Sequence, residues 1–270
     1  MPYNIIFLGT AGESLVYGKQ IRGSGGIILQ LEDFQFHIDP GPGTLLAAAQ
    51  YGINVRDNTA VLVSHAHINH CNDINAVISA MTYSGLDKKG VLVCNKTLIN
   101  GAEGITTPLT EFHKSCLERF IVLERETKVA IEDIEIKPIR LKHSDPEALG
   151  YKFFTRKFVL SYISDTEFSK DIIEQCKGSN VLIINVQNPS GVEEPGRLSI
   201  DGAVKIVEKV MPKLVIITHF GAKMIKADPM YEARELQRKT NVQVIAATDG
   251  LSVDPVSYSA TNRQKTLNLY

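Results

Sequence analysis

The stretch Val61-Leu62-Val63-Ser64-His65-Ala66-His67-Ile68-Asn69-His70 places three histidines within six residues, directly after an apolar run. The apolar run is typical of a buried strand, and side chains at i and i+2 just beyond a strand point to the same side. A third histidine from the following turn completes a tripod of imidazole nitrogens, which suits zinc. The stretch therefore predicts a metal site at the end of a strand.

Three further polar residues share this position just past the end of a predicted strand. Because strand ends gather at one edge of a sandwich or an open sheet, we expect these residues to join the histidine cluster. The predicted ligands are His65, His67 and His143 for one cation, and His70, His219 and an oxygen of residue 69 for a second, with Asp165 bridging the pair. The other two of the seven histidines, His37 and His113, lack this context and are predicted to be structural.

The composition is that of an ordinary globular protein. The chain has 270 residues, of which 44% are hydrophobic, and a net charge of -1 argues against a surface built entirely for nucleic acid, although a local basic patch stays open. Its four cysteines show no CxxC spacing and no secretory signal precedes them, so we expect reduced thiols and a cytoplasmic location. No apolar run approaches the length of a membrane span.

The order of predicted elements is nearly two-fold. Each half begins with antiparallel strands and continues with alternating helices and strands. Two sheets packed face to face with helices outside satisfy this order, which predicts a four-layer αββα sandwich of the α+β class. Residues 95–128 are the least readable part and are expected to form a loop over one edge. Pro138 limits its strand to an edge or a bulge.

Asp39 begins the sequence Asp39-Pro40-Gly41-Pro42-Gly43, directly after the strand predicted at residues 34–38. Two prolines and two glycines predict a turn there. Taken alone, the position of Asp39 favours a turn or helix cap over a catalytic carboxylate.

These motifs together resemble the metallo-β-lactamase superfamily of αββα hydrolases. The resemblance covers nearly the whole chain, and it is greatest to the ribonuclease Z and phosphodiesterase branch. It rests on motifs in the family's order, namely the early Gly-Thr-x-Gly turn, Asp-Pro-Gly-Pro-Gly, Ser-His-Ala-His-x-x-His, Lys-His-Ser-Asp followed by Gly-Tyr, Ser-Asp-Thr and Thr-His-Phe. It implies a single domain over residues 1–270, zinc (less often manganese or iron) at the ligands named above and metal-activated water as the nucleophile. Asp39 is then expected to help organise the site, and a homodimer is a further implication.

Three positions depart from that family. Asn69 replaces the aspartate of the His-x-His-x-Asp-His motif, and a neutral amide is a weaker ligand for a second metal. Arg197 stands where ribonuclease Z has a histidine thought to protonate the leaving group. Arginine cannot donate this proton, but it can clamp a phosphate or carboxylate. An ordinary surface role for Arg197 has equal weight. Bacterial and archaeal ribonuclease Z proteins carry a long arm for tRNA between the equivalents of His143 and Asp165, and here that segment has room only for a hairpin. This disfavours tRNA as a substrate and leaves other nucleic acids open.

The leading hypothesis is a cytoplasmic metal-dependent hydrolase of a phosphodiester or another small anionic ester. The alternative is a metal-binding sensor or binding protein with attenuated or lost catalysis, which Asn69 and Arg197 favour. A di-iron redox protein is a minor alternative, and β-lactam cleavage is disfavoured because no export signal precedes the domain. The turn-rich loop 187–191 and Lys223 are weaker candidates for substrate contact, for which ordinary surface roles are favoured.

Overall fold

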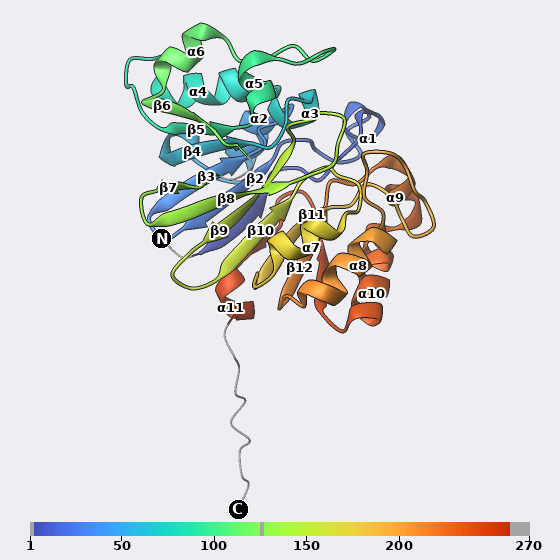
Figure 1. Cartoon of the computed structure of the whole chain (residues 1–270). Helices are drawn as coiled ribbons and strands as arrows, with labels where there is room; N and C mark the ends of the chain where they lie inside the picture. Colours follow the sequence, from blue (N-terminus) through green and yellow to red (C-terminus); the bar gives the residue numbers. More distant parts are fainter. Residues whose placement is uncertain (1–2, 125–126, 260–270) are drawn as a thin grey trace, which may run out of the picture.

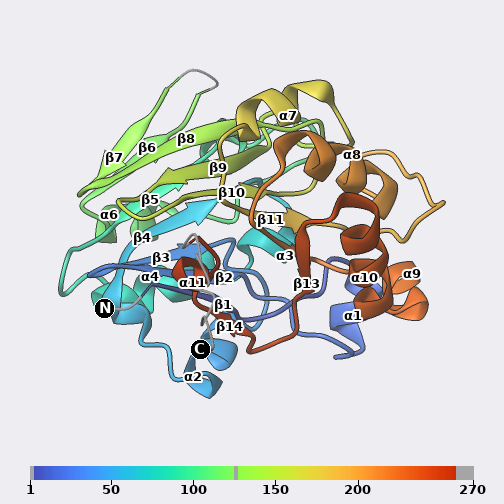
Figure 2. The same cartoon turned by 90° about the horizontal axis from the view of Figure 1, so that it is seen from below.

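Two sheets stand face to face at the centre of the molecule (Figure 1 and Figure 2). The computed structural model describes residues 3–124 and 127–259, and within them each sheet has seven strands. In spatial order the first sheet contains β14 (Ser252–Val253), β1 (Asn4–Phe7), β2 (Ile27–Leu31), β3 (Phe34–Ile38), β4 (Asn58–Val63), β5 (Val91–Cys94) and β6 (Arg119–Val122). The second contains β13 (Gln243–Ala246), β12 (Leu214–Thr218), β11 (Val181–Asn185), β10 (Val159–Ile163), β9 (Leu149–Phe154), β8 (Ile134–Arg140) and β7 (Val129–Ile131).

The helices flank the two sheets, as Figure 1 shows. Those in the first half of the chain are α1 (Ser14–Gly18), α2 (Thr44–Gln50), the 3-10 turn η1 (Val55–Asp57), α3 (Ile68–Cys71), α4 (Ile74–Thr82), α5 (Lys96–Asn100) and α6 (Glu111–Cys116). Those in the second half are α7 (Lys170–Cys176), α8 (Ile200–Val210), α9 (Ala222–Ala227), α10 (Pro229–Thr240) and α11 (Pro255–Ser259). Apolar residues of α4 pack on β4 and β5, while α7, α8 and α10 pack on the outer face of the second sheet. The predicted four-layer αββα sandwich is confirmed.

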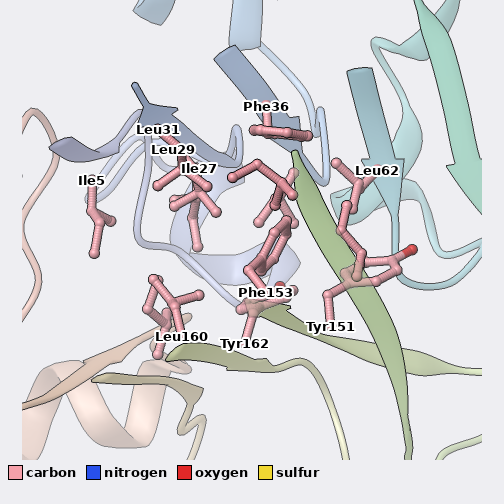
Figure 3. Close-up of a cluster of buried hydrophobic side chains, with 14 of the residues drawn as sticks. Ile5, Ile27, Leu29, Leu31, Phe36, Leu62, Tyr151, Phe153, Leu160 and Tyr162 are labelled. Carbon is pink, nitrogen blue, oxygen red and sulfur yellow. The ribbon is translucent and has the colours of Figure 1, made fainter. Parts of the chain in front are cut away.

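The main core lies between the sheets, where side chains from both inner faces meet (Figure 3). Phe36 of β3 and Phe153 of β9 meet edge to face with ring centroids 5.9 Å apart. Tyr151 is fully buried, and its hydroxyl donates a hydrogen bond of 2.6 Å to the carbonyl of Val63. Val63 is the last residue of β4. A buried Tyr usually finds such a partner, and this one ties the second sheet to the strand that leads into the histidines.

The structure differs from the expectation in two peripheral regions. Residues 95–128 are more regular than expected, because they contribute α5, α6 and the edge strand β6. Near the C-terminal end of the described chain, the short strand β14 pairs with β1 and closes the first sheet. Pro138 is tolerated in β8 because β7 pairs only as far as Ile136, so no strand of the described residues lies beside Pro138 on that side.

Within the described residues, no helix combines the length and the apolar character that a membrane crossing requires.

Candidate metal centre

The predicted ligands come together at one edge of the sandwich, where strands of both sheets end. His65 follows β4 of the first sheet, and His67 and His70 belong to the short turn and helix α3 that come next. His143, Asp165 and His219 follow β8, β10 and β12, which run in the same direction in the second sheet. The parallel direction of these strands explains why residues far apart in the sequence meet at a single edge.

The first ligand group consists of His65, His67 and His143, whose ligand atoms all lie within 4.8 Å of one another. His143 Nδ1 donates to the carbonyl of Gly196 at 2.8 Å, so its Nε2 carries the lone pair. That Nε2 lies 3.1 Å from His67 Nδ1. Two ring nitrogens this close are readily explained by a cation that both of them bind, and second-sphere bonds such as the one to Gly196 are typical of metal-ligating histidines.

His65 supports the same conclusion through a chain of hydrogen bonds. The Ser64 hydroxyl donates to the Asp39 carboxylate at 2.7 Å, so its oxygen accepts from His65 Nδ1 at 3.0 Å. This fixes the tautomer and leaves a lone pair on His65 Nε2, which is buried and has no partner among the described residues. An orphaned buried acceptor is costly, and a bound cation would satisfy it. The donor set therefore fits a zinc-type cation.

The second group contains His70, His219 and Asp165. His70 Nε2 lies 3.1 Å from His219 Nε2 and 3.5 Å from Asp165 Oδ2, and His219 Nε2 lies 3.3 Å from Asp165 Oδ1. The other His70 nitrogen, Nδ1, donates to Asp39 at 2.9 Å. His65, His70 and Asp165 also offer ligand atoms within 4.8 Å of one another, so the two groups are contiguous.

Burial and charge set the protonation of these imidazoles. Burial lowers the pKa of His65 well below its usual value, and it also lowers the pKa of His67 and His219. Burial therefore favours the neutral form of these side chains, which is the form that binds metal. Burial also acts to lower the pKa of His70, but Asp165 and Asp39 outweigh it and raise that pKa to about 10. Positive charge is thus favoured at His70, and a cation bound there would replace its proton.

Asp39 lies behind the ligands and connects them to the sheets. Its carboxylate accepts from the Ser64 amide and hydroxyl, both at 2.7 Å, from His70 Nδ1, and from the Tyr162 hydroxyl at 2.6 Å. These contacts differ from the helix cap that its local sequence favours, and they match the organising role that the resemblance implies. By holding both Ser64 and His70, Asp39 orients one imidazole of each ligand group.

Asn69 points its carboxamide at the second group, where the family motif would place a carboxylate. Its Nδ2 lies 3.1 Å from His219 Nε2. In this orientation the amide donates to the nitrogen lone pair that a second cation would use. The second group therefore has one negative charge fewer than the family pattern and one occupied ligand nitrogen.

The early glycine turn supports His219 through close packing. A Cβ atom on Gly12 would lie 2.2 Å from the carbonyl oxygen of His219, so only glycine fits there. His219 itself has a φ of 64°, in the left-handed region that residues other than glycine rarely adopt. Strained backbone of this kind is common at functional sites, where the surroundings hold it in place.

Sequence reasoning missed several polar residues that hold the ligands. Asn185 and Gln187 donate to the two oxygens of Asp165 at 2.8 and 2.9 Å. Asp145 accepts from the backbone amide of Ala66, between His65 and His67, at 3.0 Å. Each lies within two residues of a strand end or a ligand, and that proximity was the available signal.

A cavity of about 540 Å³ opens beside the ligands, and its lining includes His67, Asn69, His143 and Arg197. Arg197 Nη1 pairs with Glu194 Oε2 at 2.9 Å, and Lys223 pairs with the other oxygen of Glu194 at 2.6 Å. Arg197 is therefore beside the metal ligands, whereas Lys223 does not line this cavity. His37 and His113 belong to neither ligand group; His37 bonds to Thr44 on the far side of β3.

Comparisons with known proteins identify the family and the fold of the chain. A model of the beta-lactamase superfamily domain matches residues 35–220, which is more than half of the chain. An uncharacterised protein of Methanocaldococcus jannaschii is 30% identical over 256 residues, covering 94% of this chain and 96% of its own. A ribonuclease Z of Borrelia garinii subsp. bavariensis is 21% identical, covering 82% and 86% of the two chains. Among solved structures, the metallo-beta-lactamase fold protein YhfI of Bacillus subtilis superposes with a TM-score of 0.76 at 16% identity, covering 94% and 99%. The chain belongs to the beta-lactamase superfamily and has the metallo-β-lactamase fold.

Proposed function

We propose that this protein is a metal-dependent hydrolase that acts on a phosphodiester or another small anionic ester. The observation that carries the proposal is the convergence of histidine lone pairs, above all the buried and unpartnered Nε2 of His65. The superfamily is typically hydrolytic, and the ribonuclease Z relative is named for the cleavage of a phosphodiester. A divalent cation in such a site supplies Lewis acidity, which makes water nucleophilic near neutral pH and stabilises charge in the transition state.

The ligand groups assign the binding roles. His65, His67 and His143 would hold the first cation, and His70, His219 and Asp165 would hold a second one more weakly. Imidazole and carboxylate donors suit Zn²⁺ best, with Mn²⁺ or iron as alternatives. Because Asn69 supplies no charge, we infer that the first group dominates metal binding.

Arg197 has the role of an anion clamp in this proposal. It lines the same cavity as His67 and His143, and its planar guanidinium suits a phosphate or carboxylate oxygen pair. Arginine keeps its charge at any physiological pH, so it orients the substrate and stabilises charge without transferring a proton. Glu194 holds one side of the guanidinium, which fixes its direction.

The remaining expectations stay predictions. The expectations of a cytoplasmic location, of a homodimer and of tRNA as a disfavoured substrate rest on the sequence alone. Nucleic acid as a class remains compatible with the ribonuclease Z relative.

A metal-binding sensor is the second candidate, and the contact between Asn69 Nδ2 and His219 Nε2 favours it. An amide that occupies a ligand nitrogen weakens the second metal position, and a protein with one firmly held cation can bind an anion without turning it over. The two candidates differ in turnover, not in metal binding.

The decisive assay uses protein reconstituted with Zn²⁺ or Mn²⁺ and a panel of a phosphodiester, a lactone and a thioester. We expect hydrolysis of bis-p-nitrophenyl phosphate that is lost after treatment with a chelator and restored by metal. Fully metallated protein that cleaves no member of the panel would overturn the hydrolase proposal and leave the sensor.

Replacing Arg197 with alanine tests the anion clamp. We expect the KM for bis-p-nitrophenyl phosphate to rise about 10- to 100-fold, because hydrogen bonds to a charged group are lost. Lys205→Ala is the matched control, since Lys205 is an exposed cation that lines a neighbouring cavity together with Arg197 but does not line the cavity beside the candidate ligands. Equal KM values in the two variants would rule out the clamp.

A further inference from the structure

Gln187 combines burial with an unused hydrogen-bond acceptor beside the metal centre. The residue is only 4% exposed, and its Oε1 has no hydrogen-bond partner among the described residues. Four buried side-chain atoms have no hydrogen-bond partner among the described residues, and two of them lie at this site. One is Gln187 Oε1, and the other is His65 Nε2, which a bound cation would explain. Because buried polar groups are nearly always paired, the Gln187 oxygen also calls for a ligand.

The direction of the amide is fixed by its other end. Gln187 Nε2 donates to the carbonyl of Gly12 at 3.0 Å and to Asp165 Oδ2 at 2.9 Å. Both partners are pure acceptors, so a flipped amide would set an oxygen against a carbonyl and a carboxylate. The unpaired group is therefore the oxygen, and it can only accept.

The residue that carries this buried acceptor also lines the cavity beside the candidate ligands. Gln187 lines the cavity of about 540 Å³ together with Arg197, His67 and Asp165. If Arg197 and the cation hold the anionic group of a substrate in this cavity, the rest of that substrate lies near the other lining residues. A hydroxyl or N–H group on that part of the substrate would supply the hydrogen-bond donor that Oε1 lacks.

We propose that Gln187 is a specificity-determining residue, whose Oε1 accepts a hydrogen bond from a hydroxyl or amine of the substrate. The substrate class is then an anionic ester whose esterified group carries a hydrogen-bond donor. This inference rests on the proposed hydrolase function. A site built to bond a substrate donor discriminates strongly against the analogue that lacks it, because the buried acceptor is then left unpaired.

Two matched esters test this inference, p-nitrophenyl 3-hydroxyphenyl phosphate and p-nitrophenyl phenyl phosphate, which differ only in a ring hydroxyl that cannot reach the phosphorus atom. With metal-loaded wild-type protein we expect kcat/KM for p-nitrophenol release to be at least about tenfold higher for the hydroxyphenyl ester. In Gln187→Met, which keeps the side-chain length but cannot accept this bond, we expect the ratio to fall to about one. Thermal unfolding and metal content establish that the variant is folded and loaded.

Asn185→Leu is the matched control, because Asn185 holds the other oxygen of Asp165 but does not line the cavity. It should slow both esters equally and keep the wild-type ratio. Equal wild-type rates for the two esters would mean that no substrate donor bonds to Oε1, and they would overturn the inference even if Gln187→Met fails to fold. Turnover of neither ester would instead contradict the proposed hydrolase function.

Discussion

His65→Ala is expected to abolish metal binding and hydrolysis together. His65 belongs to the first ligand group, and its ligand atom also lies within 4.8 Å of those of His70 and Asp165. Its buried Nε2 has no partner among the described residues, so it is free to bind the first cation. Loss of the first cation removes both the activation of water and the stabilisation of transition-state charge, and we expect kcat/KM to fall by more than about 10³-fold. Elemental mass spectrometry and the bis-p-nitrophenyl phosphate assay measure the two effects on one sample.

The control for His65→Ala is His113→Gln. His113 bonds to Ser79 and Thr110 on the outer helices and takes part in neither ligand group, so its replacement should leave metal content and rate unchanged. A His65→Ala protein that keeps the wild-type metal content would contradict the assignment of the first group.

Asn69→Asp is expected to strengthen the second metal position. The substitution places a carboxylate 3.1 Å from His219 Nε2, where the amide now donates, and adds a negative charge beside the second group. We expect the affinity for the second equivalent of Zn²⁺ to rise at least about tenfold, with a higher hydrolysis rate, since changes in the hydrogen-bond partners of metal ligands already alter metal affinity by about 10- to 100-fold. Titration by calorimetry resolves the two equivalents.

Asn72→Asp separates this effect from charge alone. Asn72 is exposed, lies just past α3 and does not line the cavity, so the same charge there should change the second affinity little. A large gain in rate for Asn69→Asp would mean that the natural protein is attenuated. No change in affinity would show that residue 69 does not face a second cation.

The sequence was sufficient to predict the elements around the site where the spacing of apolar residues marked a helix or strand and polar residues followed its end. The apolar positions of the helix after the histidines, Ile74, Val77, Ile78 and Met81, recur at helical spacing, and all are fully buried in α4. The candidate ligands could be grouped from the sequence because His65, His143, Asp165 and His219 follow predicted strands, and strands that run in parallel bring their ends to one edge. The predicted family and fold are confirmed.

Other features depended on tertiary contacts that no short pattern encodes. The helices and strand within residues 95–128 are only four to six residues long, too short for a clear periodicity. Asp145 follows His143 by two residues, and no local pattern shows that it is fully buried and accepts hydrogen bonds from the backbone amide of Ala66 and from the side chains of Asn95 and Thr97. Gln187 likewise fell in a segment that sequence alone favours as a plain surface connection, whereas it is buried against Asp165.

The most direct test of a metal-dependent hydrolase is the metal content per chain of protein purified without added metal, measured by elemental mass spectrometry and paired with the bis-p-nitrophenyl phosphate assay. The arrangement of His65, His67 and His143 predicts at least one equivalent of a divalent metal, with turnover that disappears on chelation and returns with metal. Protein that binds no metal after reconstitution and shows no turnover would contradict the account.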